Sequence, residues 1–181
     1  MFEGEYLNGK KWNGYGKEYY ILNNDLLFEG EYLRGKRWIG KVKIYNNRNL
    51  EFEGEYLNGI KNKGKEYNKQ GILIYEGEYS KEKRDGNGKE YNEEGKFLFQ
   101  GIFFNGKKWS GYGKEYDYHG KIIYEGEYLS GKRNGKGKEY DYYGKLIFEG
   151  EYYDGKKWNG KGKEYDSNGK LIKEREYLNG Q

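Results

Sequence analysis

Hydrophobic and polar positions alternate along short stretches of this chain. Residues 124–128 read Tyr-Glu-Gly-Glu-Tyr, so an extended backbone places the two tyrosines and the glycine on one face and the two glutamates on the other. Such period-two alternation over a short aromatic run predicts a β-strand. Residues 130–135 are rich in types that tolerate positive φ and predict a turn, 137–140 resume an extended pattern, and 141–144 predict a second turn. Each unit is therefore expected to be a β-hairpin.

The pentad recurs at intervals of 23 to 26 residues, which is the signature of a repeat protein. Intact copies begin at Phe2, Phe28, Phe52, Tyr75, Tyr124 and Phe148, and altered copies begin at Phe99 and Lys173. We expect one array of seven full repeats and a partial one, at residues 2–27, 28–51, 52–74, 75–98, 99–123, 124–147, 148–172 and 173–181.

Glycine is frequent, with 31 residues spread along the chain, and no stretch shows apolar residues at helical spacing. Each glycine inside a helix costs roughly 1 kcal/mol relative to alanine, so helices are not expected. A glycine in a strand exposes bare backbone on which an aromatic ring of the neighbouring strand can lie. The predicted fold is all-β, an elongated, twisted, single-layer antiparallel sheet of tandem hairpins with a rod or trough shape.

Composition supports a folded chain with a thin core. Hydrophobic residues make up 34% and charged residues 35%, a balance that often indicates disorder. Here the formal charge is only +4, and 19% of the residues are aromatic, so rings supply the ordering force. The absence of cysteine excludes disulfides and thiolate metal sites. The first repeat begins at Phe2 and no apolar run approaches a membrane span, so a cytoplasmic location is expected.

Residues 124–137, YEGEYLSGKRNGKG, resemble the MORN (membrane occupation and recognition nexus) repeat. The likeness covers essentially the whole chain, and six of the seven full units keep the Gly-Glu-Tyr core. The linker at 141–147 is similar to variant MORN-type repeats of bacterial, protist and large-virus proteins. The resemblance implies a sheet that docks partner segments, that often self-associates, and that serves as a scaffold near membranes or the cytoskeleton.

Three repeats depart from the pattern. Repeat two reads Gly-Lys-Val-Lys-Ile at 40–44 and lacks the second strand glycine. Repeat four reads Tyr-Ser-Lys-Glu-Lys at 79–83 and lacks the Asn-Gly of the turn, whereas repeat five carries Gln100 and Ile102 in place of the pentad glutamates. If any unit forms a kink or a distinct surface, these three are the candidates.

The four tryptophans share one position, the third after the turn glycine, in repeats whose turn is one residue longer than that of repeat six. This spacing predicts that they lie along one border of the sheet beside basic residues, where they could contact a partner or lipid headgroups. The candidate partner-binding residues are Trp12, Trp38, Trp109, Trp158, Lys11, Arg37, Lys108 and Lys157. Alternatively, each tryptophan only fills the gap made by its longer turn.

No catalytic, cofactor-binding or metal-binding residue is expected. The paired glutamates Glu125 and Glu127 are ~7 Å apart on a strand, a span that glycosidases use, but intact units all copy them. The single histidine, His119, lies in a predicted turn without a partner, and no helix follows the Gly-Lys-Gly at 135–137 to make a phosphate loop. We therefore expect a protein that is not an enzyme.

Two functions from different classes remain. The first is an interaction scaffold that docks a protein partner or a second copy of itself, near a membrane or the cytoskeleton. The alternative is an aromatic repeat module that binds anionic phospholipid or glycan. Glutamates interleave with the lysines, so a nucleic-acid partner is not expected. Salt separates the two, because lipid binding should collapse between ~0.05 and ~0.5 M salt and apolar docking should survive.

Overall fold

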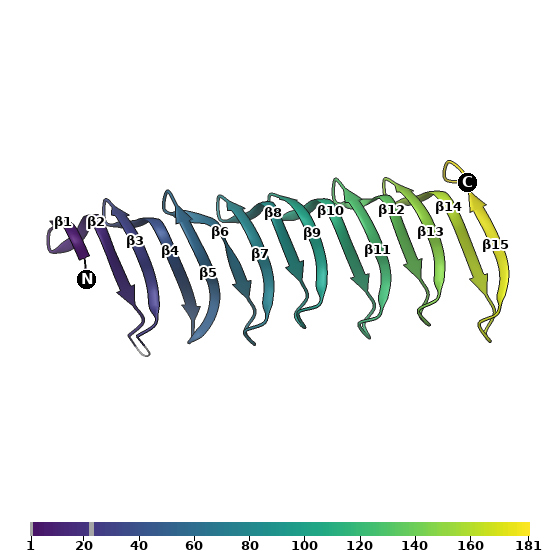
Figure 1. The fold of residues 1–181 in the computed structure, drawn as a ribbon, viewed down its shortest axis with the longest axis horizontal. Coiled ribbons are helices and arrows are strands. Elements are labelled where there is room, and N and C mark those ends of the chain that lie inside the picture. The colour runs from purple at the N-terminus through teal and green to yellow at the C-terminus, as the bar shows by residue number, and fades with distance from the viewer. Residues whose placement is uncertain (1, 22–23) are drawn as a thin grey trace. The chain divides into compact units, whose positions relative to one another are not determined.

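The computed structural model describes residues 2–21 and 24–181, which form β-strands and turns without a helix. Met1, and residues 22–23 of the predicted first repeat, lie outside the described residues. The chain divides into two compact units, Met1–Lys96 and Phe97–Gln181. In both units every strand lies beside the next one in the sequence (Figure 1).

In the first unit the paired strands are antiparallel throughout. These are β1 (Phe2–Leu7), β2 (Lys10–Tyr19), β3 (Leu26–Leu33), β4 (Lys36–Asn46), β5 (Asn49–Leu57), β6 (Ile60–Tyr67), β7 (Leu73–Ser80) and β8 (Lys83–Tyr91).

The second unit follows the same plan, again with antiparallel pairs. Its strands are β9 (Phe97–Phe104), β10 (Lys107–Tyr116), β11 (Ile122–Leu129), β12 (Lys132–Tyr140), β13 (Leu146–Tyr153), β14 (Lys156–Tyr165) and β15 (Leu171–Tyr177). The all-β prediction, an antiparallel sheet of tandem hairpins, is confirmed.

The turn that follows each pentad is shorter than predicted. In repeat six only Ser130 and Gly131 form it, with φ of 53° and 75°, and β12 already begins at Lys132. Positive φ at both central residues is the type I′ geometry, which matches the right-handed twist of the flanking strands. Repeat four keeps this geometry without glycine, because Lys81 and Glu82 adopt φ of 49° and 62°. The predicted turn at 130–135 was therefore wrong beyond Gly131.

The extra residues lie in bulges on the second strand of each hairpin. In repeat six Gly126 pairs with Gly137 and Tyr128 pairs with Arg133, so three residues face Glu127 alone. Gly135 lies in this bulge with φ of 79°, and the side chain of Glu127 covers it. A bulge absorbs extra residues without moving the turn, which explains why repeats of different length share one turn type.

Aromatic rings lie over strand glycines, as predicted, and one ring can cover a glycine on each of two strands. Gly126 on β11 pairs with Gly137 on β12, and the ring of Tyr124, two residues before Gly126 on the same strand, covers both. A Cβ built on Gly126 would lie 2.7 Å from the Gly137 Cα and 2.4 Å from the Tyr124 hydroxyl oxygen. For Gly137 this is a ring from the neighbouring strand, as the sequence predicts, and the same ring also covers the glycine of its own strand. Only glycine leaves room for this close approach.

The core of each unit is a row of these rings on one sheet face. The first ring of the pentad is exposed by no more than 1% in six repeats, at Phe28, Phe52, Tyr75, Phe99, Tyr124 and Phe148. Neighbouring rings meet edge to face, as Tyr124 does with Tyr152 at 5.2 Å between ring centres. Such pairs contribute about 0.5–1.5 kcal/mol beyond the area that they bury.

Candidate functional site

Each tryptophan is the extra residue of a bulge and not part of a longer turn. In repeat one, Glu5 pairs with Asn13 and Tyr6 pairs with Lys11, which leaves Trp12 without a partner on β1. Trp38, Trp109 and Trp158 occupy the same position in their hairpins. Repeat three places Asn62 there, so tryptophan is not required to form the bulge.

The tryptophans lie where consecutive hairpins meet at the turn border. The carbonyl of Trp12 accepts a hydrogen bond of 2.8 Å from the N–H of Gly35, the turn glycine of the next hairpin. The turn glycines Gly59, Gly131 and Gly180 donate to Trp38, Trp109 and Trp158 in the same way, at 2.8 to 3.0 Å. The backbone at these residues therefore joins neighbouring turns, and the prediction that the tryptophans share one border holds within each unit.

Exposed apolar side chains accompany the tryptophans. The residue after each pentad is strongly exposed, at Phe104 (59%), Leu129 (50%) and Tyr153 (61%) in the second unit. Phe104 lies 5.6 Å from Trp109 between ring centres, and Trp109 is itself 42% exposed. We call these residues, with their counterparts in the first unit, the tryptophan border. Its members are Leu7, Trp12, Leu33, Trp38 and Leu57 in the first unit and Phe104, Trp109, Leu129, Tyr153 and Trp158 in the second.

The basic residues predicted beside the tryptophans lie over the aromatic core instead. The ammonium of Lys11 is 4.9 Å from the centre of the Tyr32 ring, and that of Lys157 is 5.0 Å from Phe148. Arg37 lies 5.3 Å from Phe28 and Lys108 lies 5.7 Å from Phe99. These four cations cover rings, so the structure does not bring them together with the tryptophans into one row of contacts.

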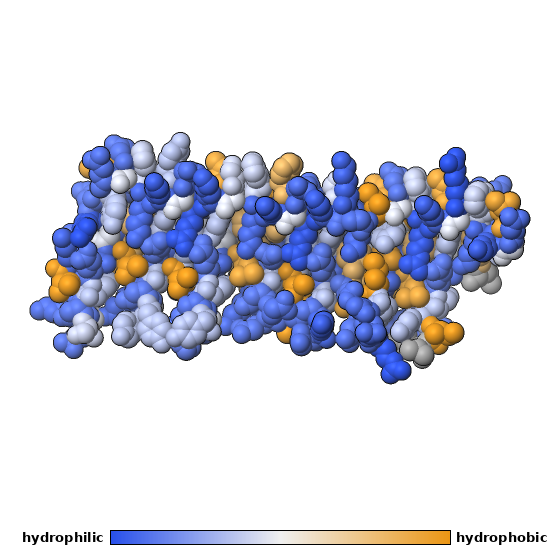
Figure 2. Space-filling model, turned by 180° about the vertical axis from the view of Figure 1, so that it is seen from behind, coloured by the Kyte–Doolittle hydropathy of each residue, from blue (hydrophilic) through white to orange (hydrophobic). Residues whose placement is uncertain are grey.

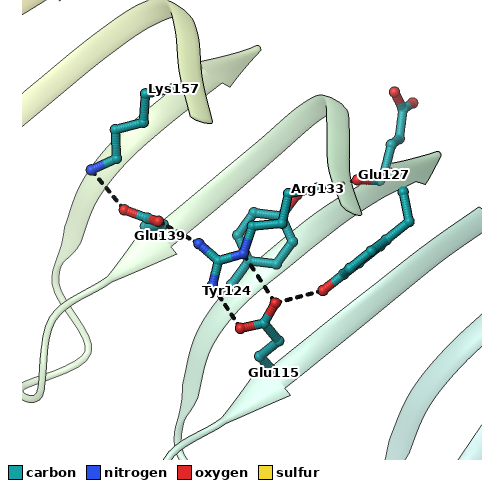
Figure 3. A network of polar contacts seen from close by, with 7 residues as sticks. Glu115, Tyr124, Glu127, Arg133, Glu139 and Lys157 are labelled. Atoms are coloured by element: carbon teal, nitrogen blue, oxygen red, sulfur yellow. Dashed lines mark hydrogen bonds and ion pairs between the residues drawn. The ribbon is translucent and has the colours of Figure 1, made fainter. Parts of the chain in front are cut away.

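In the second unit one of these cations, Lys157, belongs to a network of charged groups around Arg133 (Figure 3). Arg133 donates two hydrogen bonds to Glu115, at 3.0 and 2.6 Å, and one of 2.6 Å to Glu139. Glu139 also lies 2.7 Å from the ammonium of Lys157, and the hydroxyl of Tyr128 donates to Glu115 at 2.7 Å. The arginine fork thereby fixes one carboxylate of the preceding hairpin, Glu115, and one of its own strand, Glu139.

This network changes the acidity of its members. Burial acts to raise the pKa of the Glu115 carboxyl, but hydrogen bonds from Arg133 and Tyr128 outweigh burial and hold the pKa below its ordinary value. Burial, together with the hydrogen bond to Glu115, raises the pKa of the Tyr128 hydroxyl well above 10. Glu115 is thus ionised and Tyr128 is neutral at physiological pH, a pairing that stabilises the fold but offers neither a base nor an acid near pH 7.

The opposite sheet face carries the pentad glutamates. Glu125 accepts a hydrogen bond of 2.8 Å from the hydroxyl of Tyr140 and lies 3.1 Å from the ammonium of Lys114. The hydrogen bond from Tyr140 is the main cause of a lowered pKa at Glu125. Burial, together with the bond to Glu125, raises the pKa of Tyr140 to about 12. Charged side chains with separate hydrophobic patches between them are visible from behind (Figure 2).

Shallow hollows occur on the described sheets. One in the first unit has a volume of about 460 Å³ and is lined by Leu27, Val42, Gly54 and side chains of both charges from β4, β5 and β6. Another, of about 500 Å³, lies among Lys157, Glu164 and Arg175 in the second unit. Neither gathers polar groups around one apolar cavity as a small-molecule site does.

His119 lies in the turn between β10 and β11, where its ring is 3.9 Å from the Tyr118 ring between centres, tilted by 41°, and its Nε2 lies 3.3 Å from the hydroxyl of Tyr142. Among residues 2–21 and 24–181 no group of three or more His, Cys, Asp or Glu side chains is arranged to hold a metal ion. A search of the same residues finds no helix that could span a membrane.

Sequence reasoning missed the role of the glutamate in the Lys-Glu-Tyr at the end of the second strand, which every full repeat except the second carries. Glu115 and Glu139 belong to this set, and each bonds a cation of the following hairpin. The signal was present, because a Lys or Arg stands two residues after the turn glycine in every full repeat except the fourth, where Arg84 follows Glu82 by two. Alternation alone does not reveal this role, because both faces of the sheet are half polar.

No family model matches this chain, and no curated protein matches it. What the residues and the fold establish is a β-hairpin repeat protein. Only the resemblance of the motif at 124–137 points to one particular family of such repeats.

Proposed function

We propose that this chain is a MORN-type repeat scaffold that docks a segment of a protein partner, or a second copy of itself, along the tryptophan border. The proposal includes a cytoplasmic location, near a membrane or the cytoskeleton, and no catalytic activity. The motif YEGEYLSGKRNGKG at 124–137 supports the family, and the hairpin repeat supports the architecture.

The exposed row of apolar side chains at the turn border carries the proposal. Phe104, Leu129 and Tyr153 recur at the same position of successive hairpins and are at least half exposed. Leaving such side chains in water forfeits about 1.5–3 kcal/mol each relative to full burial. Aromatic residues are enriched at the centres of protein interfaces, and tryptophan is the commonest anchor. A repeated border of this kind suits an extended partner segment that crosses several hairpins.

The distribution of carboxylates favours a scaffold over an enzyme. Glu115 and Glu139 are both occupied by cations, and Glu18 and Glu66 have the same kind of partner in the first unit. An active site usually contains a group whose environment differs from that of its relatives. Here the same arrangement is repeated from hairpin to hairpin, as expected when the groups stabilise the fold.

One observation favours the alternative of anionic-lipid binding. The lysine that directly follows the turn glycine is exposed two residues before each tryptophan, at Lys10, Lys36, Lys107 and Lys156. Tryptophan beside lysine is the composition of membrane-interface segments. This arrangement makes a lipid surface the second candidate, to be separated from protein docking by salt.

The test is affinity capture from a lysate of the source cells at about 0.15 M salt. The variant W38A/W158A removes one ring from each unit, and Y118A/Y143A is its matched control, because these two tyrosines are 85% and 75% exposed in turns that connect β10 to β11 and β12 to β13. We expect a near-stoichiometric protein that binds the native chain and the control but not W38A/W158A. Equal capture by all three would exclude the border as the docking site.

Vesicles that contain anionic phospholipid provide the other arm. Binding that is lost between ~0.05 and ~0.5 M salt, without a captured protein, would establish the lipid alternative. Sedimentation of the purified chain at increasing concentration then distinguishes self-association, since W38A/W158A should remain monomeric where the native chain does not.

A further inference from the structure

A glutamate near the end of the second strand links consecutive hairpins on the aromatic face at several junctions. There its carboxylate accepts a hydrogen bond from the second pentad tyrosine of the next repeat and pairs with a cation of that repeat. In the second unit Glu115 receives Tyr128 and Arg133. In the first unit Glu66 receives Tyr79 and Arg84, and Glu18 receives Tyr32 and Arg37.

Repeat two breaks this rule at Ile44. Ile44 pairs with Phe52 on β5, just as Glu18 pairs with Phe28 and Glu66 pairs with Tyr75. An isoleucine therefore occupies the register position at which the other linking glutamates present a carboxylate. The substitution removes an acceptor and a negative charge from the aromatic face between β4 and β6.

The two donors that would have bonded this carboxylate are present in repeat three. They are Tyr56 on β5 and Lys61 on β6, which are register partners. Within residues 2–21 and 24–181 the Tyr56 hydroxyl makes no hydrogen bond and the Lys61 ammonium makes no ion pair. The ammonium lies 4.3 Å from the centre of the Phe52 ring and 5.7 Å from Tyr79, so the cation is held over the core.

Two charged side chains from the hairpins on either side act on the Tyr56 hydroxyl. Arg37 is close enough to influence the Tyr56 hydroxyl, and its own guanidinium is bonded to Glu18. Glu82, in the turn of repeat four, also acts on Tyr56, but its carboxylate accepts a hydrogen bond of 3.2 Å from the backbone N–H of Lys61. Neither side chain supplies an acceptor for the Tyr56 hydroxyl.

We propose that the aromatic face at Ile44, Tyr56 and Lys61 is a binding site for the carboxylate group of a ligand. The ligand's carboxylate takes the place of the missing glutamate and accepts one hydrogen bond from the Tyr56 hydroxyl and one from the Lys61 ammonium. A carboxylate matches the chemistry because the same donor pair, a tyrosine and a cation, holds Glu115 and Glu66. Bonds between charged groups in a half-buried setting are stronger than neutral ones.

This site is separate from the tryptophan border, because it uses the aromatic face and does not depend on the bulged tryptophans. Its ligand can be a free carboxylic acid or an acidic side chain of a docked partner, and these sources share the recognised group. Two probes distinguish them, sodium acetate and a short capped peptide that contains a single glutamate. Sodium chloride at equal ionic strength is the reference for both.

The first measurement is the shift of the backbone amide resonances of Tyr56 and Lys61 during titration with each probe. We expect saturable shifts at these two residues in the native chain and at least a tenfold weaker response in Y56F and in K61M. Shifts with both probes mean that the carboxylate alone is recognised, whereas shifts with the peptide alone assign the site to an acidic partner segment. Shifts with neither probe, or equal shifts in K61M, would overturn the proposal.

The second measurement restores the glutamate within the chain. I44E should raise the melting temperature by about 2–4 °C and abolish the response to acetate, since its own carboxylate occupies the donors. I44Q is the matched control of equal size without charge, and it should not gain stability. If I44E and I44Q melt at the same temperature or below the native chain, the donors do not form a carboxylate site.

Discussion

The guanidinium carbon of Arg133 lies 4.0 Å from the centre of the Tyr124 ring, which is itself completely buried. A single-layer sheet has no second layer to cover its core, so the rings lie between the glycine backbone on one side and charged side chains on the other. Arg133 covers Tyr124 and fixes Glu115 and Glu139 at the same time. The same arginine therefore covers the aromatic core and holds the carboxylates around it.

Removal of this arginine should destabilise the fold. R133M keeps most of the side-chain volume but leaves Glu115 and Glu139 without their shared cation, and we expect a loss of about 1–3 kcal/mol in the free energy of unfolding. K132M is the matched control, because Lys132 pairs with the exposed Asp154 and should change stability by less than about 0.5 kcal/mol. Urea titrations of both variants measure the difference, and equal losses would contradict the role given to Arg133.

The paired glycines under the rings should tolerate no side chain. In G126A the new Cβ would lie 2.7 Å from the Gly137 Cα and equally close to the Lys136 carbonyl oxygen, so the strands must separate. We expect a loss of at least about 3 kcal/mol or failure to fold. In G155A the Cβ meets nothing within 4 Å, and only the positive φ of 85° is unfavourable, at about 1 kcal/mol. Melting temperatures of the two variants should differ accordingly, and similar values would show that the close approach does not matter.

Stability should fall in alkaline solution. The pKa of Tyr140 is raised to about 12 in the fold, against about 10 in the unfolded chain. A raised pKa favours the neutral hydroxyl in the fold, so its contribution is complete below pH 10 and is lost as the pH rises toward 12. In Y140F this titration is absent, and the decrease in the free energy of unfolding between pH 10 and 12 should be smaller than in the native chain. An identical decrease would mean that Tyr140 is not shifted.

The tryptophan rings should matter less for folding than the core rings. Trp109 is 42% exposed and packs against Phe104, which is itself more than half exposed, so W109A should cost no more than about 1 kcal/mol. F148A removes a fully buried ring and should cost about 3–5 kcal/mol. Melting curves followed by circular dichroism compare the two. A loss in W109A as large as that in F148A would show that the tryptophan only fills the bulge.

Much of the fold could be predicted from the sequence because the same alternating pentad and turn residues recur in successive repeats. The alternation in residues 124–128 predicts the buried and exposed faces of β11 correctly. The bulge at Trp109 could not be predicted, because an extra residue before Gly111 reads equally well as a longer turn. The position of Lys157 over Phe148 was also missed, since a basic residue beside a tryptophan in sequence can point to the other face.

In the network around Arg133, the arginine and Glu115 are 18 residues apart in the chain. The repeat period does not reveal such a pair until it is known which side chains lie on the same face of the sheet. Likewise, segment 40–44 departs from the repeat in sequence by its missing glycine, whereas the consequence of Ile44 for Tyr56 and Lys61 follows only from the register of β4, β5 and β6. Local patterns thus predict the strands, whereas cross-strand chemistry requires the structure.

Site-specific photo-crosslinking in the source cells tests the central claim most directly. A photoreactive phenylalanine analogue replaces Phe104 on the tryptophan border in one sample and Tyr118 in the turn before β11 in the other, two positions that are both strongly exposed. The account predicts a discrete crosslinked protein, or a crosslinked dimer of the chain, from position 104 and none from position 118. Crosslinks of equal yield from both positions, or from position 118 alone, would contradict it.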